Sequence, residues 1–108
     1  AQHAEEGPPT AVLGDLNAGE GSEPLKTFFE GGYQSAVLAL HPMSSTGTFN
    51  GFRDPTGGDR IDHILLGPGL NPLQAEILDG QVDGVWPSDH FPVAAVISLA
   101  MRDTGMEP

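Results

Sequence analysis

The chain has 108 residues, with fifteen acidic and four basic side chains that give a net charge of −11. This charge disfavours polyanionic partners such as nucleic acid, because their binding relies on Lys and Arg to displace counterions from phosphates. The absence of cysteine excludes disulfides, thiolate metal sites and cysteine nucleophiles. No apolar run approaches the roughly 18 residues that a membrane span requires.

The first part of the chain predicts one strand and one helix. Residues 1–10 are polar and contain a proline pair, so we expect a linker or loop there. Residues 11–17 (AVLGDLN) are typical of a short buried strand that runs into a polar end. Residues 22–32 predict a helix with Ser22 as its N-cap and a glycine pair at its end. Residues 33–40 are ambiguous between strand and helix.

The rest of the chain is richer in strands, which we expect over residues 46–52, 60–67, 73–78 and 93–100. We expect residues 101–108 to be a frayed tail. Several short strands between Gly/Pro turns, with one or two helices, predict an α+β domain over residues 11–100. Because Ala1 is not an initiator Met, we also expect further residues upstream.

Polar side chains interrupt the apolar pattern at three places. The first is GDLN, where Asp15 and Asn17 share one face of the strand if its extended geometry continues. The alternative is a turn in which Asn17 tolerates a left-handed backbone. The second is Asp62, which by alternation lies on the apolar face with Ile64 and Leu66. A buried carboxylate costs several kcal/mol unless it is paired or hydrogen-bonded.

Two structural alternatives remain for Asp62: an ion pair with Arg60, or a register slip that turns it to solvent.

The third interruption is the pair Asp89 and His90, held between two prolines that restrict the backbone; here the alternative is a capped turn. Together the three places supply an imidazole, a carboxylate that can orient it, and an Asp/Asn pair. This is a recurrent arrangement for proton transfer or for stabilising anionic charge.

The three motifs, in this order, resemble the C-terminal half of the endonuclease/exonuclease/phosphatase (deoxyribonuclease I-like) superfamily. GDLN matches the family's Gly-Asp-Phe-Asn, RIDHIL its Ile-Asp-aromatic-Ile strand, and SDHFPV its Ser-Asp-His-x-Pro-Val. GTFNGF, before RIDHIL, resembles bacterial members. The resemblance covers residues 12–96 and implies a partial αββα sandwich, that is, half of a four-layer fold made of short strands with one or two helices.

The resemblance implies a role for each polar residue. Asp15 would orient or activate the attacking water, and Asn17 would stabilise the pentacoordinate phosphoryl transition state. His90 would contact the scissile phosphate as general base or electrostatic stabiliser, and Asp62 would hold its ring. Asp89 would lie next to a divalent metal, as a direct or water-mediated ligand. Mg²⁺, with Mn²⁺ or Ca²⁺ as alternatives, suits oxygen ligands and phosphate chemistry.

The chain departs from the family pattern at three positions, one of which, Leu16 for Phe, is a tolerable apolar swap. His63 replaces an aromatic residue and is interpreted as a packing residue. Asn50 lies where relatives often carry His, so we assign it a substrate-binding role. His3 and His41 lack metal-ligand spacing and are expected at the surface. The glutamates near the N-terminus lie in a polar stretch and are poor substitutes for the family's metal-binding Glu, so the resemblance implies half of a site.

Two functions follow as hypotheses. The first is a metal-dependent phosphoesterase that hydrolyses a phosphodiester or phosphomonoester by in-line attack of water, present here as a C-terminal portion that is inactive alone. Its partners would be the missing N-terminal half and a phosphate ester, with nucleic acid and phospholipid headgroups among the candidates. The alternative is a catalytically inactive interaction module that docks on another chain. The compartment is open between secreted and cytoplasmic bacterial, and the lack of cysteine is compatible with export.

Overall fold

The computed structural model describes residues 8–53 and 58–99. These ranges contain five strands and two helices, in the order β1 (Ala11–Asp15), α1 (Glu23–Glu30), β2 (Gln34–Ser35), α2 (Ala36–Leu40), β3 (Asp62–Leu66), β4 (Leu70–Ile77) and β5 (Val93–Leu99). The predicted tail, most of the predicted linker and His3 lie outside the described residues. The helices of the described ranges are α1 and α2, and neither is long and apolar enough to cross a membrane.

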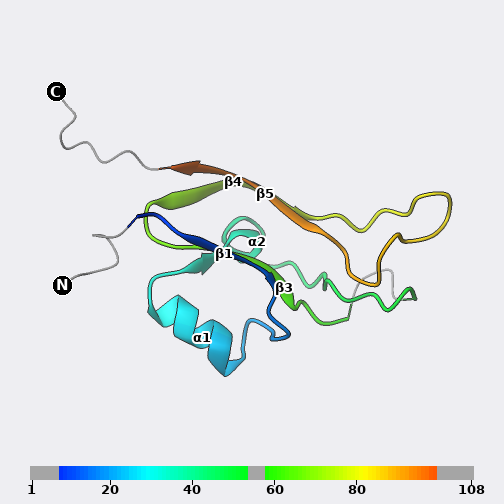
Figure 1. The fold of residues 1–108 in the computed structure, drawn as a ribbon, viewed down its shortest axis with the longest axis horizontal. Helices are drawn as coiled ribbons and strands as arrows, with labels where there is room; N and C mark the ends of the chain where they lie inside the picture. Colours follow the sequence, from blue (N-terminus) through cyan, green and yellow to red (C-terminus); the bar gives the residue numbers. More distant parts are fainter. Residues whose placement is uncertain (1–7, 54–57, 100–108) are drawn as a thin grey trace.

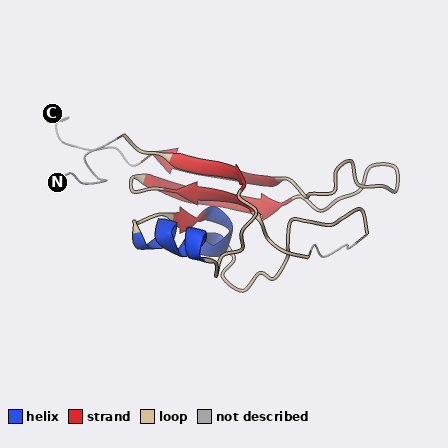
Figure 2. Cartoon of the chain, turned by 60° about the horizontal axis from the view of Figure 1, so that its bottom comes forward, coloured by secondary structure: helices blue, strands red, loops and turns tan. Residues whose placement is uncertain are grey.

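The strands form two antiparallel sheets (Figure 1). β3 is the middle strand of a three-stranded sheet in the order β1–β3–β2, and β4 pairs with β5 in a separate hairpin. Helix α1 lies on one side of the three-stranded sheet and the β4–β5 hairpin lies on the other (Figures 1 and 2). The predicted α+β class and partial-sandwich architecture are confirmed.

β3 is buried on both of its faces, and the core of the molecule therefore surrounds it. Leu66 is fully buried and packs in one cluster with Ala36, Val37 and Ala75, which come from α2 and β4. Leu65 lies on the opposite face by strand alternation and is also fully buried. Because its neighbours on both sides are fixed in this way, β3 is a rigid support for any side chain that it carries.

The predicted helix is present, and the glycine pair that follows it explains where it ends. α1 has Ser22 at the N-cap position, although the Ser22 side chain donates to the carbonyl of Gly19 rather than capping the helix. Gly32 has a φ of 95°, a left-handed conformation that glycine adopts without strain and that stops the helix. The ambiguous residues 33–40 contain both structures, since β2 leads directly into α2.

The strand predicted over residues 46–52 is wrong: this segment forms a single bridge, from Phe49 to His90. The N–H groups of Thr48 and Phe49 both donate to the carbonyl of Asp59, at 2.9 and 3.1 Å, which a regular ladder does not allow. A Cβ on Gly47 would also collide with the carbonyl of Gly58. The segment therefore passes too close to residues 58–59 to pair as a strand.

We expect Leu66→Ala to lower the free energy of unfolding by about 2–5 kcal/mol, because it leaves a cavity beside a core that cannot collapse around β3. Met43→Ala is the control, since Met43 is 91% exposed and its loss should change that free energy by less than about 0.5 kcal/mol. Urea unfolding of the complete protein measures both. Equal effects of the two changes would contradict the assignment of the core.

Candidate active site

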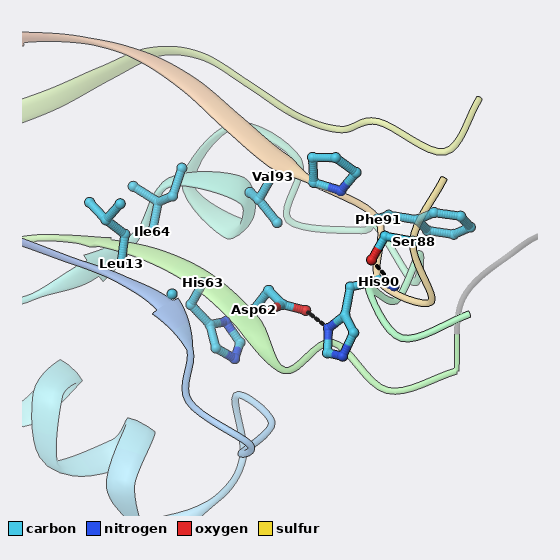
Figure 3. Close-up of a pocket in the computed structure, with 10 residues that line it drawn as sticks. Leu13, Asp62, His63, Ile64, Ser88, His90, Phe91 and Val93 are labelled. Carbon is cyan, nitrogen blue, oxygen red and sulfur yellow. Dashed lines mark hydrogen bonds and ion pairs between the residues drawn. The ribbon is translucent and has the colours of Figure 1, made fainter. Parts of the chain in front are cut away.

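Two carboxylates and one imidazole meet at one end of the β1–β3 pair. The antiparallel register places Asp15 of β1 opposite Asp62, the first residue of β3. His90 reaches the same place from the loop that precedes β5 (Figure 3). Single donor atoms of Asp15, Asp62 and His90 all lie within 4.8 Å of one another. The structure thus brings together three of the six residues that the sequence indicated as a site.

The central contact of this cluster is the hydrogen bond between His90 and Asp62. His90 Nδ1 lies 2.7 Å from Asp62 Oδ2, and the two side chains are 26% and 19% exposed (Figure 3). The alternative of an ion pair between Asp62 and Arg60 does not hold, because Arg60 Nε lies 2.8 Å from Glu20 Oε2 instead. The carboxylate in the apolar strand is therefore satisfied by Nδ1 of the imidazole, and the other ring nitrogen, Nε2, lies 3.9 Å from Asp89 Oδ1.

The surroundings of His90 favour its charged form. The hydrogen bond that His90 donates to Asp62 raises the pKa of His90 above its ordinary value of 6.5, and the charges of Asp62, Asp89 and Asp15 act in the same direction. Partial burial opposes them without reversing the shift. Because the folded-state pKa is raised, His90 stabilises the fold fully below pH 6.5, and this contribution is lost as the pH rises through the folded-state pKa.

The GDLN turn orients Asp15 and ends the strand before Asn17. β1 ends at Asp15, so the extended geometry on which a shared strand face depends does not continue, and the alternative, a turn with a left-handed Asn17, is confirmed. Asn17 instead has a φ of 53°, and its N–H donates to Asp15 Oδ1 at 2.8 Å. This Asx-type turn fixes the carboxylate of Asp15. Gly14, with a φ of 135°, supplies the backbone conformation just before it.

Asp89 lies at the edge of the cluster. Its side chain is 47% exposed, and its Oδ1 atom is 3.9 Å from His90 Nε2. Mg²⁺ is commonly held by one or two carboxylates while it keeps several waters. The exposed carboxylate of Asp15 fits that donor set and belongs to the group of ligand atoms within 4.8 Å of one another, which does not include Asp89, so the metal-ligand role of Asp89 stays a prediction. Asp62 fits it less well, because its Oδ2 atom is already engaged by His90. The described residues therefore offer part of an oxygen-ligand site for a divalent cation.

Asn50 lies beneath the cluster rather than facing outward. It is 3% exposed, its Nδ2 donates to the carbonyl of Ser88 at 3.1 Å, and its Oδ1 accepts the N–H of Phe52. Its backbone N–H donates to the carbonyl of Asp89 at 2.7 Å. This geometry favours a positioning role for Asn50 under the loop that carries Asp89 and His90. The predicted contact with substrate stays a prediction.

Sequence reasoning missed Thr48, which links the two halves of the cluster. This residue is fully buried, and its hydroxyl oxygen accepts the N–H groups of Ile61 and Asp62 at 2.9 and 3.1 Å. Its carbonyl accepts the N–H of Phe91 at 2.6 Å, next to His90. The only sequence signal was a small hydroxyl residue inside GTFNGF, because a hydroxyl can satisfy two donors at once.

The two other histidines of the described residues, His41 and His63, agree with their interpretation. His63 is 3% exposed, and its Nε2–H donates to the carbonyl of Ala18 at 2.7 Å, so it packs and also fixes the turn that follows Asp15. His41 is exposed, with Nε2 2.8 Å from the carbonyl of Ala75.

A hollow of about 300 Å³ opens beside the cluster, with Leu13, Asp62, His63 and His90 among the residues that line it.

We expect Asp62→Asn to lower the pKa of His90, because the neutral amide removes the charge and the charged hydrogen-bond acceptor that stabilise the imidazolium. An NMR titration of the imidazole C–H signals measures the change. Glu30→Gln is the control, since it removes an exposed negative charge on α1 and should leave the pKa of His90 unchanged. An unchanged or higher pKa of His90 in Asp62→Asn would contradict the assignment.

Thr48→Val should lower the free energy of unfolding by about 1–3 kcal/mol, because the isosteric methyl group leaves two buried N–H groups without an acceptor. Thr48→Ser keeps the hydroxyl and is the matched control. Urea unfolding compares the two variants. If Val is tolerated as well as Ser, the hydroxyl does not support the start of β3.

Comparison with known proteins adds the family. Residues 1–90 match the Endonuclease/Exonuclease/phosphatase family. No curated protein matched the chain. Among solved structures, a functionally unknown conserved protein from Enterococcus faecalis is 29% identical, with a TM-score of 0.67, and the match covers 84% of this chain and 36% of that one.

Two further solved structures come from Bacteroides thetaiotaomicron, and each is 25% identical to this chain. One is a mannosyl-6-phosphatase, with a TM-score of 0.69 and coverage of 84% of this chain and 38% of that one. The other is an endonuclease/exonuclease/phosphatase family protein, with a TM-score of 0.67 and coverage of 82% and 37%. The chain thus spans little more than a third of the length of the structures that it matches. With a family match over residues 1–90, the chain belongs to the endonuclease/exonuclease/phosphatase family.

Proposed function

We propose that this chain is the C-terminal part of a metal-dependent phosphoesterase. The observation that carries the proposal is the His90–Asp62 hydrogen bond of 2.7 Å beside the oriented carboxylate of Asp15. An imidazole held by a carboxylate, next to a second carboxylate, can serve a reaction in which water attacks and negative charge develops. The similarity to a mannosyl-6-phosphatase supports a phosphate monoester as one class of substrate.

In the proposed reaction, Asp15 accepts a hydrogen bond from the attacking water and orients it toward phosphorus. The water oxygen bonds to phosphorus as the bond to the leaving oxygen breaks; of the two water protons, one stays on the product phosphate and the other passes to the leaving oxygen. His90 presents Nε2 to the phosphoryl group, and its raised pKa favours the charged imidazolium, which stabilises the developing negative charge. Asp62 keeps the ring in place through Nδ1. Asn17 would stabilise the transition state from the neighbouring turn.

Asp89, with Asp15 as the second carboxylate, is the proposed holder of the divalent cation, and Mg²⁺ is the first candidate. When bound, such a cation supplies positive charge that offsets the charge of the phosphate. A complete site needs a further ligand, which we propose lies in the part of the domain outside this chain. The exposed apolar side chains of Leu13, Val96 and Leu99, 66%, 51% and 56% exposed, are suited to pack against that part.

The alternative function, an inactive interaction module, needs no ordered imidazole. A module that docks through an apolar face gains nothing from a partly buried carboxylate in β3 that is paired with His90. The cost of placing Asp62 in an apolar strand is explained by the reaction and not by docking. The ordered pair therefore favours the enzyme over the module.

We expect His90→Ala and Asp15→Ala each to lower the rate of phosphate ester hydrolysis by the complete protein by about 10²-fold or more, because each removes a group that meets the reacting atoms. Chelation of divalent cations should abolish the activity, and Mg²⁺ should restore it. Met43→Ala is the control and should retain the rate. Losses below tenfold in both site variants would contradict the assigned roles.

A further inference from the structure

A second and larger hollow lies next to the candidate site, formed by the loop between β4 and β5. Its volume is about 550 Å³, within the range typical of sites for small molecules. Trp86, Leu78 and Phe91 contribute apolar walls, and the hollow shares His90 and Ser88 with the first one. A molecule that places a phosphate at His90 can therefore extend its other end into this second hollow.

The wall that carries Trp86 is preformed. Trp86 Nε1 donates to the carbonyl of Asp79 at 3.0 Å, and the Trp86 ring meets Phe91 edge to face, with centroids 5.6 Å apart. At the tip of the loop, Asp83 and Gly84 have φ values of 52° and 80°, as in a tight two-residue hairpin turn. A wall held before the ligand arrives lowers the ordering cost of binding.

The charge of the hollow limits what can enter. Glu76 and Asp79 line it, and none of the described residues that line it is Lys or Arg. A second anionic group on the ligand, placed away from His90, would meet the carboxylates of Glu76 and Asp79 and no Lys or Arg among the described lining residues. An uncharged ring instead finds the indole of Trp86, which offers a large apolar surface and a π face.

We propose that this second hollow binds the leaving group of the phosphate ester, and that Trp86 selects esters whose leaving group carries an uncharged ring. The inference rests on the proposed function, because it needs a phosphate at His90. In the reaction the bond between phosphorus and the leaving oxygen breaks, that oxygen takes a proton, and the released alcohol or phenol lies against Trp86. Esters with a further negative charge, chains of nucleotides included, are disfavoured.

The test compares two phosphate monoesters, phenyl phosphate and glycerol phosphate, with the complete protein and Mg²⁺. Trp86→Ala should lower the preference for phenyl phosphate, as the ratio of the two kcat/KM values, by about tenfold, the scale of one lost aromatic contact. The change should appear mainly in the KM for phenyl phosphate. Trp86→Phe should retain most of the preference, and Val85→Ala, an exposed neighbour outside the hollow, should keep it fully.

A third ester separates charge from shape: 4-carboxyphenyl phosphate should have a lower kcat/KM than phenyl phosphate with the unmodified protein. An unchanged preference in Trp86→Ala, or equal use of the two aryl esters, would overturn the inference and leave the proposed function standing. Absence of hydrolysis with every ester would overturn the proposed function instead. Binding to the second hollow is then tested without hydrolysis, with phenol as the ligand. Phenol should quench the part of the tryptophan fluorescence that Trp86→Phe removes. No quenching of that part would overturn the inference.

Discussion

The hydrogen bond between Asp62 and His90 is the interaction on which the rest of the site depends. It connects β3, the strand that is buried on both faces, to the loop that precedes β5. A carboxylate at the start of such a strand is costly unless a partner satisfies it, and the imidazole meets that need. The same bond selects which ring nitrogen of His90 is left for another molecule, so stability and chemistry share one contact.

The irregular segment around Thr48 is the second constraint, because it fixes both ends of that contact. Thr48 holds the backbone of Asp62 through its hydroxyl and the backbone next to His90 through its carbonyl. Asn50 holds the loop from below through Ser88. A regular strand would direct these backbone groups to its neighbours alone. The loss of strand geometry over residues 46–52 thus releases the donors and acceptors that position the pair.

Several elements of the fold and the pairing of Asp62 could be predicted from the sequence, because their signals were local or belonged to a motif. The glycine pair after α1 and the apolar runs of β3 and β5 predicted those elements, and the carboxylate in RIDHIL predicted a partner for Asp62. The role of Thr48 could not be predicted, since its partners are eleven to forty-three positions away in the chain and are brought close only by folding. For Asn17 the sequence left a continued strand and a left-handed turn as alternatives, because local pattern alone does not decide where a strand ends, and the structure has the turn.

A double-mutant cycle on the rate of phosphate ester hydrolysis tests the central claim most directly. It compares the complete protein with Asp62→Asn, His90→Ala and the two changes together. If Asp62 acts through His90, Asp62→Asn slows the unmodified protein but has no further effect once His90 is Ala. If the two effects multiply instead, Asp62 acts independently of His90, and the hydrogen bond between them is not the basis of the site.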